Sequence, residues 1–330
     1  MLKLIASRSV QGIIVLLVVS ALTFTLLAAA GGDALTALRN DPLISEEALN
    51  GLRRIYGLDQ PLPVRYVRWL YDILHGRLGY SLFYQAPVGS IIRPRLLHTL
   101  LLAAAALVIA WTVSLALGTW AVRRRGGWVD RVCGLVILLA ASTPRIVLAL
   151  VALAVGARTS LFAIGVAPQE LSTGKMLLSV IPPAIVLSVP LIALFLAQVR
   201  ESLRAALREE FVRVARAKGL PERIVVLRHA LRAGLNPLIT IFGYSLGGVI
   251  SGSVIVETVL GWQGLGQLSV VAVRNRDVPL LMGVVLVTAT AVLLGNLFAD
   301  VLLHLNDPRL RLVEARRITA SSATASTPAA

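Results

Sequence analysis

The feature that most constrains this sequence is a set of apolar runs, each long enough to cross a lipid bilayer. A bilayer core about 30 Å thick needs roughly 20 apolar residues in a helix. Because lipid offers no partner to backbone N–H and C=O groups, each run is expected to be a helix. Five runs carry no charge: Ser9–Gly32, Leu96–Val122, Met176–Val199, Ala233–Val256 and Val278–Ala299. A sixth, Val132–Val155, is interrupted only by Arg145.

These runs predict an all-α membrane protein with six transmembrane helices. Residues 1–32 are expected to form an N-terminal tail and the first transmembrane helix, and residues 33–95 an extracytoplasmic segment. Residues 96–312 are expected to form a five-helix core with a cytoplasmic loop at 200–234. Residues 313–330 are rich in Ala, Ser and Thr without a periodic pattern, which predicts a disordered tail.

The first run has two interpretations. Lys3 and Arg8 precede an apolar stretch that ends in Ala28-Ala29-Ala30, as in a cleaved secretory signal. The apolar stretch is longer than the usual core of a signal peptide, which favours an uncleaved membrane anchor.

The distribution of charge predicts the orientation of the chain. A net charge of +15 in a soluble domain would indicate a nucleic-acid-binding protein. A mean hydropathy of +0.80 excludes that class, because so much apolar surface has no soluble core to enter. With the N-terminus inside, cytoplasmic segments hold 19 basic residues and the short outer loops hold four. The long segment 31–95 is largely exempt from the positive-inside rule, so both termini are predicted to be cytoplasmic.

Two of the runs have unusual residues. The fourth contains Pro182, Pro183 and Pro190 and is expected to be kinked or locally unwound, because proline removes a hydrogen-bond donor and clashes with the preceding turn. In the fifth run, small residues at a spacing of four predict close approach of another helix. These small residues are Gly243, Gly247, Gly248 and Gly252.

The loop before the fifth run is expected to form a helix, a tight turn and a second helix. The first helix has an apolar stripe at helical spacing, made of Leu203, Leu207, Phe211 and Val214. Gly219 is expected to end this helix, and Pro221 suits the first turn of the next. The second helix would place three apolar residues on one side: Ile224, Leu227 and Leu231.

This basic and apolar loop allows two interpretations. It could lie on anionic lipid with its basic residues toward the headgroups. Alternatively, it could dock into a groove on a cytoplasmic partner.

The residues of the loop closely resemble those of one family of membrane proteins. The loop reads FVRVARAKGL at 211–220 and RHALR at 228–232, followed by Pro237. This resembles the coupling loop of ABC importer permeases in the peptide/nickel (dipeptide/oligopeptide) family. The general signature of such loops begins with Glu-Ala, whereas Arg213 and Val214 occupy those positions here, as is usual in the peptide branch.

Segments elsewhere resemble the same family in the same order. They are YGLDQPLPVRY at 56–66, GRLGYS at 76–81, ETVLGWQGLG at 257–266, RDVP at 276–279, DVL at 300–302 and DPRLRL at 307–312. The resemblance covers almost the whole chain up to Leu312.

The resemblance implies a fold, a function and a set of partners. The fold would be a type I-like ABC permease with a cytoplasmic coupling helix, in the plasma (inner) membrane. The chain would form half of the pathway for peptides or similar small polar solutes. Its partners would be a homologous permease in a heterodimer, two ATPase subunits, an extracytoplasmic solute-binding protein and membrane lipid, with no nucleic acid. The residues expected to couple to the ATPase are Phe211, Arg213, Ala215, Arg216, Ala217, Lys218 and Gly219.

No cofactor or metal is expected in this chain. The sequence has no Gly-x-x-x-x-Gly-Lys-Ser/Thr segment for nucleotide phosphates and no His/Cys/Asp/Glu cluster with metal-ligand spacing. The chain is therefore expected to be a non-catalytic subunit, with ATP and Mg²⁺ bound by the partner ATPases.

Arg145 lies about midway along the interrupted run, after Ser142 and Pro144. An arginine near the bilayer centre costs at least ~2.5 kcal/mol, so it should face protein or water. It could pair with Asp300, with Glu257 or with an acid of a partner subunit. Alternatively, Ser142, Pro144 and Arg145 could line the substrate pathway, where the guanidinium would meet an anionic group. A shifted boundary of the span is the third interpretation.

The alternative function is a self-sufficient secondary transporter or channel. Such a protein would need intramembrane ionisable relays and usually an inverted internal repeat, which this sequence fits poorly. A membrane-anchored enzyme is disfavoured because no catalytic constellation stands out.

Overall fold

The computed structural model describes residues 2–29, 47, 51, 57, 59–124, 126–159 and 173–306. The predicted tail at 313–330 lies outside the described residues.

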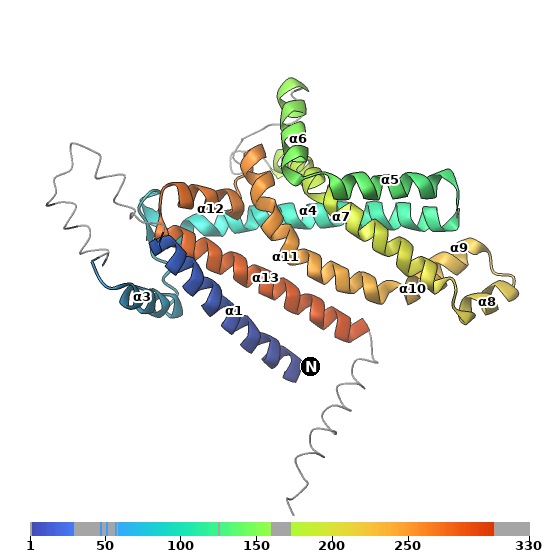
Figure 1. Ribbon diagram of the computed structural model, residues 1–330, viewed down its shortest axis with the longest axis horizontal. Helices are drawn as coiled ribbons and strands as arrows, with labels where there is room; N and C mark the ends of the chain where they lie inside the picture. The colour runs from blue at the N-terminus through green and yellow to red at the C-terminus, as the bar shows by residue number, and fades with distance from the viewer. Residues whose placement is uncertain are drawn as a thin grey trace, which may run out of the picture.

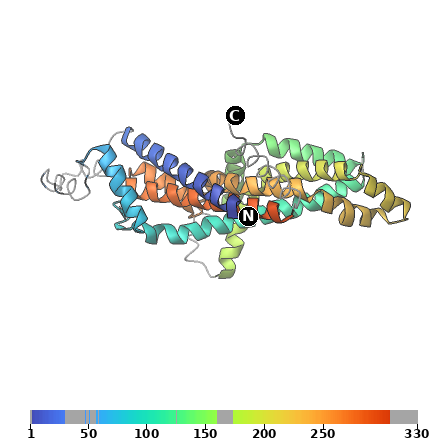
Figure 2. The same ribbon diagram turned by 90° about the horizontal axis from the view of Figure 1, so that it is seen from below.

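Five long helices run side by side along the long axis of the molecule (Figures 1 and 2). They are α1 (Leu2–Ala29), α4 (Val88–Arg123), α7 (Thr173–Ala206), α11 (Leu235–Leu260) and α13 (Val278–Asn306). Each contains a stretch long and apolar enough to cross a membrane. The predicted all-α class and the five uncharged spans are therefore confirmed.

The sixth predicted span is a bent pair of helices instead of one straight helix. Helix α5 (Trp128–Ser142) and helix α6 (Arg145–Thr159) meet at an angle of 97°. Thr143 between them is extended, with φ −88° and ψ 119°, because a residue before proline is disfavoured in the helical region. Arg145 therefore begins α6 and does not lie in the middle of a helix. Figure 1 shows α6 projecting from the bundle.

The shorter elements gather at the two ends of the bundle (Figure 1). One end carries α3 (Leu62–Leu74), a two-stranded antiparallel sheet and α12 (Leu265–Arg274). The strands of this sheet are β1 (Tyr80–Ser81) and β2 (Ala86–Pro87). The opposite end carries the connection from α7 to α11, which folds into α8 (Glu210–Ala217), α9 (Glu222–Ile224), the π-helix η3 (Val225–Ala230) and α10 (Leu231–Ala233). The first residues of α1, the turn between α4 and α5 and the last residues of α13 point toward this same end.

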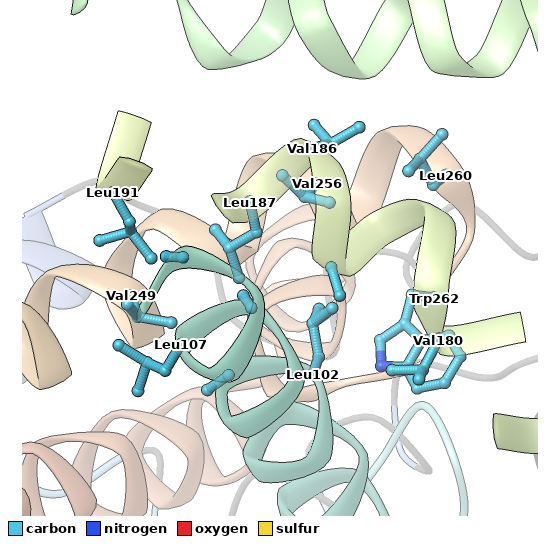
Figure 3. Packing of buried hydrophobic residues seen from close by; sticks show 14 of the residues in the cluster. Leu102, Leu107, Val180, Val186, Leu187, Leu191, Val249, Val256, Leu260 and Trp262 are labelled. Atoms are coloured by element: carbon cyan, nitrogen blue, oxygen red, sulfur yellow. The ribbon is translucent and has the colours of Figure 1, made fainter. Parts of the chain in front are cut away.

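The main apolar core lies where α4, α7 and α11 meet. Figure 3 shows side chains of the three helices pointing toward one another, including Leu102, Leu187 and Val256. All three are almost completely buried. The core therefore joins the second, fourth and fifth predicted spans into one unit.

Glycines in α11 allow the close helix packing that their spacing predicts. A side chain at Gly243 would overlap Ala299 of α13, and a Cβ at Gly247 would lie 3.0 Å from Val292 Cγ1. Close approach to α13 is thus confirmed for these two glycines. Gly252 allows close approach of Arg145 of α6, so the prediction is confirmed there as well, whereas Gly248 faces open space and the prediction is wrong for it.

The proline-rich helix α7 is kinked and is not unwound. Its helical assignment is continuous from Thr173 to Ala206 and includes Pro182, Pro183 and Pro190. Figure 2 shows the first part of α7, drawn yellow-green, directed away from the axis of the remainder. Loss of the proline N–H bonds and the clash of each ring with the preceding turn account for the bend.

Candidate functional site

The connection from α7 to α11 is held by a small apolar core of its own. Val212 and Ala215 of α8 pack with Val225 and Val226 of η3. The same cluster includes residues from the ends of three spanning helices: Val122 of α4, Val199 and Leu203 of α7, and Leu238 of α11. Helix α8 is therefore packed into one cluster with the ends of α4, α7 and α11.

The turn after α8 has the geometry that the sequence predicts. Gly219 has φ +75°, which is a left-handed conformation that favours glycine. The Gly219 N–H donates to Arg216 O at 2.9 Å and the Leu220 N–H donates to Ala215 O at 3.3 Å, which together form a Schellman motif. Pro221 then caps the start of α9. The predicted helix–turn–helix is confirmed, although its second part is divided into α9, η3 and α10.

The predicted apolar stripe of the first loop helix is wrong. Leu203 and Leu207 are buried, whereas Phe211 and Val214 are 41% and 54% exposed. The reason is that α7 ends at Ala206 and a separate helix begins at Glu210, after an extended residue. This break changes the helical phase, so residues of α8 other than those in the stripe face the inner core.

In the second loop helix, the predicted apolar side is confirmed for Ile224 and Leu227, which line one hollow together, and this side faces outward. Ile224 and Leu227 are 39% and 43% exposed, and Leu231 is only partly buried. The buried residues of this segment are Val225, Val226 and Ala230. Because η3 is a π-helix, its wider turn alters which side chains face inward.

These phase changes leave a mixed apolar and basic surface, which we call the outer loop face. It consists of Phe211, Arg213, Val214, Ile224, Leu227 and Arg228, all of them exposed. One hollow of about 580 Å³ on this surface is lined by Pro221, Arg223, Ile224, Leu227 and Arg228. A second hollow of about 330 Å³ is lined by Phe211, Arg228, His229, Arg232 and Ala233. Arg228 belongs to both hollows, so they adjoin.

The seven predicted coupling residues lie in different surroundings. Phe211, Arg213, Ala217, Lys218 and Gly219 are exposed. Arg216 is also exposed, but its guanidinium pairs with Glu222 across the turn at 2.7 and 3.1 Å. That contact raises the pKa of Arg216. Ala215 is buried in the inner core and has no surface to offer a partner.

An ion-pair cluster that sequence reasoning missed fixes α5 to α7 beside this loop. Asp130 Oδ1 accepts from Arg200 Nη2 at 2.6 Å and from Arg204 Nη2 at 2.8 Å. The side chains of Arg200 and Asp130 are largely buried, and that of Arg204 is 34% exposed. The spacing of the two arginines places them on one helix face, which indicates a shared acidic partner. The sequence does not identify that partner, because Asp130 lies about 70 positions away.

Removing this carboxylate should destabilise the protein. We expect Asp130→Ala to lower the free energy of unfolding by about 2 kcal/mol, because two partly buried guanidiniums lose their acceptor. The melting temperature in detergent measures the effect. Arg131→Ala, which removes an exposed charge from the same helix, is the control and should leave the melting temperature unchanged. Equal melting temperatures for Asp130→Ala and the parent would contradict the assignment.

Arg145 lies at the corner between α5 and α6, beside the exposed Ser142 and Pro144. Its guanidinium packs against Gly252 of α11 so closely that any side chain at that position would overlap it. Within the described residues, no hydrogen bond or ion pair reaches Arg145.

The two acids predicted to pair with Arg145 within this chain have other partners. Asp300 pairs with Arg8 of α1 at 2.8 Å, and Glu257 accepts hydrogen bonds from other elements. Pairing of Arg145 with either acid is therefore wrong, because α11 and α13 direct these carboxylates elsewhere. Pairing with an acid of a partner subunit stays a prediction.

Helix α11 exposes a second feature that sequence reasoning missed. Its exposed positions recur every three or four residues: Thr240, Tyr244, Gly248, Ser251, Ile255 and Thr258. We call this the polar face of α11, since hydroxyl groups dominate it and Tyr244 is 83% exposed. From Ile13 to Leu26 of α1, by contrast, the exposed large side chains are all aliphatic. Lipid favours the aliphatic kind of surface, so the polar face of α11 suits a partner or a water-filled pathway.

Glu257, near the end of α11, is fully buried within a network of neutral donors. Its carboxylate accepts from Thr99 Oγ1 of α4 at 2.9 Å, from Ser253 Oγ at 2.8 Å and from the Gln267 N–H of α12 at 3.1 Å. A side chain at Gly264 or at Gly266 would overlap the Glu257 carboxylate, so both positions require glycine. Glu257 thus joins α4, α11 and α12.

Two family models match this chain. Residues 114–312 match the model described as binding-protein-dependent transport system inner membrane component. Residues 1–103 match the model described as the N-terminal part of a binding-protein-dependent transport system membrane component.

Several curated proteins are similar over nearly the whole chain. A putative peptide permease protein of Brucella suis biovar 1 is 34% identical over 94% of this chain and 100% of its own length. A probable peptide ABC transporter permease protein of Sinorhizobium fredii is 33% identical over 93% of this chain and 98% of its own. An oligopeptide transport system permease protein of Bacillus subtilis is 32% identical over the same shares.

Proposed function

The chain belongs to the binding-protein-dependent transport system inner membrane component family, and from that membership we propose how it takes part in transport. It is a multi-pass inner membrane protein and a non-catalytic transmembrane subunit of an ABC importer. Such a subunit works with an ATPase and a substrate-binding protein. The family gives no support to a self-sufficient secondary transporter or channel.

The proposed cargo is peptides or similar small polar solutes, and this chain forms half of their pathway. The support comes from relatives that are named peptide or oligopeptide permeases. The assembly contains a homologous permease, two ATPase subunits that bind ATP and Mg²⁺, and an extracytoplasmic binding protein. Both termini lie in the cytoplasm, which the positions of the 19 basic residues support.

The outer loop face is the proposed docking surface for the ATPase. The observation that carries this proposal is that the outer loop face exposes large apolar side chains while the loop beneath it is fixed to three spanning helices. Lipid contact alone would need a continuous apolar face. Here two adjoining hollows can receive side chains of a protein partner, and the arginines that line them can pair with acidic residues of that partner.

Transport then follows from the rigid connection of α8 to the bundle. Closure of the ATPases on ATP moves the Gly219 turn, and the small apolar core of the loop carries α4, α7 and α11 with it. These helices change the side on which the pathway is open, and hydrolysis returns them. The polar face of α11 and Arg145 line this chain's half of the pathway.

The most direct test is purification with co-expressed partners. We expect one solute, presented by its binding protein, to stimulate ATP hydrolysis by the reconstituted complex. Purification of this chain without partners, followed by transport after reconstitution, would overturn the proposal.

Removing the charge at the pathway corner tests the role of Arg145. We expect Arg145→Ala to lower uptake of an anionic solute about tenfold, because a charge-assisted hydrogen bond contributes ~1.5–3 kcal/mol. Uptake of a peptide with a free C-terminal carboxylate is compared with uptake of its amidated form, which should change less. Arg158→Ala, at the exposed far end of α6, is the matched control. Unchanged uptake and basal ATPase activity in Arg145→Ala would exclude Arg145 from the pathway.

A further inference from the structure

Helix α3 packs against α1 at the level of the membrane. The Tyr66 hydroxyl lies 2.9 Å from Ser20 Oγ and donates to Leu17 O at 3.3 Å. The Tyr66 ring centroid is 5.6 Å from that of Phe24, and the Arg65 guanidinium carbon is 5.8 Å from the Phe24 ring centroid. These α1 residues belong to its membrane span, so α3 lies beside the part of α1 that lipid surrounds.

One apolar stripe of α3 is largely exposed in the described structure, and its ring contact is between Tyr71 and His75 at the end of the same helix, with ring centroids 4.2 Å apart. It consists of Val64, Val67, Tyr71 and Leu74, which are 49%, 63%, 60% and 78% exposed. The spacing of three, four and three residues places them along one side of the helix. None of the α3 residues is buried, although the helix is strongly amphipathic.

The charged residues of α3 occupy a narrow sector apart from this stripe. Arg65, Arg68 and Asp72 recur at helical spacing and leave the remainder of the circumference apolar. Figure 2 shows α3 running across the end of α1 and not along it. A helix with these properties presents its uncovered apolar side toward the bilayer interior and its charged side toward water.

We infer that α3 is an interfacial helix whose uncovered stripe inserts into the lipid leaflet at the end of the bundle opposite the outer loop face. The occupant is lipid: acyl chains cover the stripe, and the exposed Arg68 meets headgroup phosphates. The exposed Tyr71 supplies an amphipathic aromatic ring of the kind that membrane interfaces favour. Helix α3 thereby fastens the segment between α1 and α4 to the membrane.

Spin labels on both sides of the helix test this inference in the assembled transporter in lipid nanodiscs. The labels are placed by Val67→Cys and Tyr71→Cys, with Arg68→Cys as the control, after Cys133→Ser removes the single native thiol of this chain, and the labelled subunit is then assembled with its partners. Relaxation by oxygen reports lipid, and relaxation by a water-soluble nickel chelate reports water. We expect the ratio of oxygen to nickel relaxation to be several-fold higher at 67 and 71 than at 68.

Two results would overturn the inference. Strong nickel relaxation at 67 and 71 would place the stripe in water. Protection from both reagents would place it against a protein, such as the partner permease. Leu74→Cys gives an independent measurement on the same stripe if a label at Val67 or Tyr71 disturbs assembly.

Discussion

Replacing Gly219 by valine is expected to abolish most ATP-driven uptake while the subunit still reaches the membrane. At the φ of +75° found here, a residue with a side chain is less stable than glycine by roughly 1–2 kcal/mol. A β-branched residue such as valine tolerates this left-handed conformation least. No atom lies within 4 Å of an added Cβ, so the effect comes from the backbone alone. Relief of this strain would open the turn and separate α8 from η3, dividing the outer loop face.

Two matched variants distinguish loss of coupling from general strain. Gly219→Asn keeps a residue that tolerates the left-handed conformation and should retain most of the uptake. Gly76→Val introduces the same strain at φ +74°, also in open space, at the opposite end of the molecule, and should transport normally. ATPase activity and uptake are measured on the same preparations. Normal uptake by Gly219→Val, or equal loss in Gly76→Val, would contradict the role of the turn.

Replacing Glu257 by alanine is expected to prevent accumulation of folded protein. The change leaves the Thr99 hydroxyl and the Gln267 N–H without their acceptor, at ~1–3 kcal/mol for each group, while the Ser253 hydroxyl keeps Ile250 O as an acceptor. It also removes the link through Glu257 between α4 and α12, which leaves the Leu265 N–H bond to Thr99 Oγ1 to hold these helices. The yield of monodisperse protein in detergent and its melting temperature measure the loss.

Two controls accompany this variant. Glu257→Gln keeps one acceptor oxygen in place and should recover part of the yield. Thr258→Ala changes the exposed neighbouring residue and should behave like the parent. A stable Glu257→Ala protein would show that the hydrogen bonds of this carboxylate do not hold α4, α11 and α12 together.

Local rules predict much of this fold. Uncharged apolar runs are sufficient to predict the five long helices, because a backbone surrounded by lipid must satisfy its hydrogen bonds internally, as a helix does. Gly219 and Pro221 were sufficient for the turn after α8, because each residue restricts the backbone by itself. The break at Thr143 was also readable from Pro144, although the interrupted run was interpreted as one span.

The remainder depends on contacts that no local pattern contains. The π-helical turn of η3 changes which loop residues face inward. A prediction that assumes the 3.6-residue period of a regular α-helix cannot account for this change. Asp130 meets Arg200 and Arg204 only after α5 has folded onto α7. Arg145 was assigned acids that the fold directs elsewhere, because its true neighbour is the backbone at Gly252.

The most direct test of ATPase docking is photocrosslinking from the outer loop face. A photoreactive phenylalanine analogue replaces Phe211 in one sample and Tyr71 in another, because both are exposed aromatic residues at opposite ends of the molecule. Docking predicts a crosslink from position 211 to the ATPase subunit and none from position 71. Adducts from position 211 to lipid alone would contradict it.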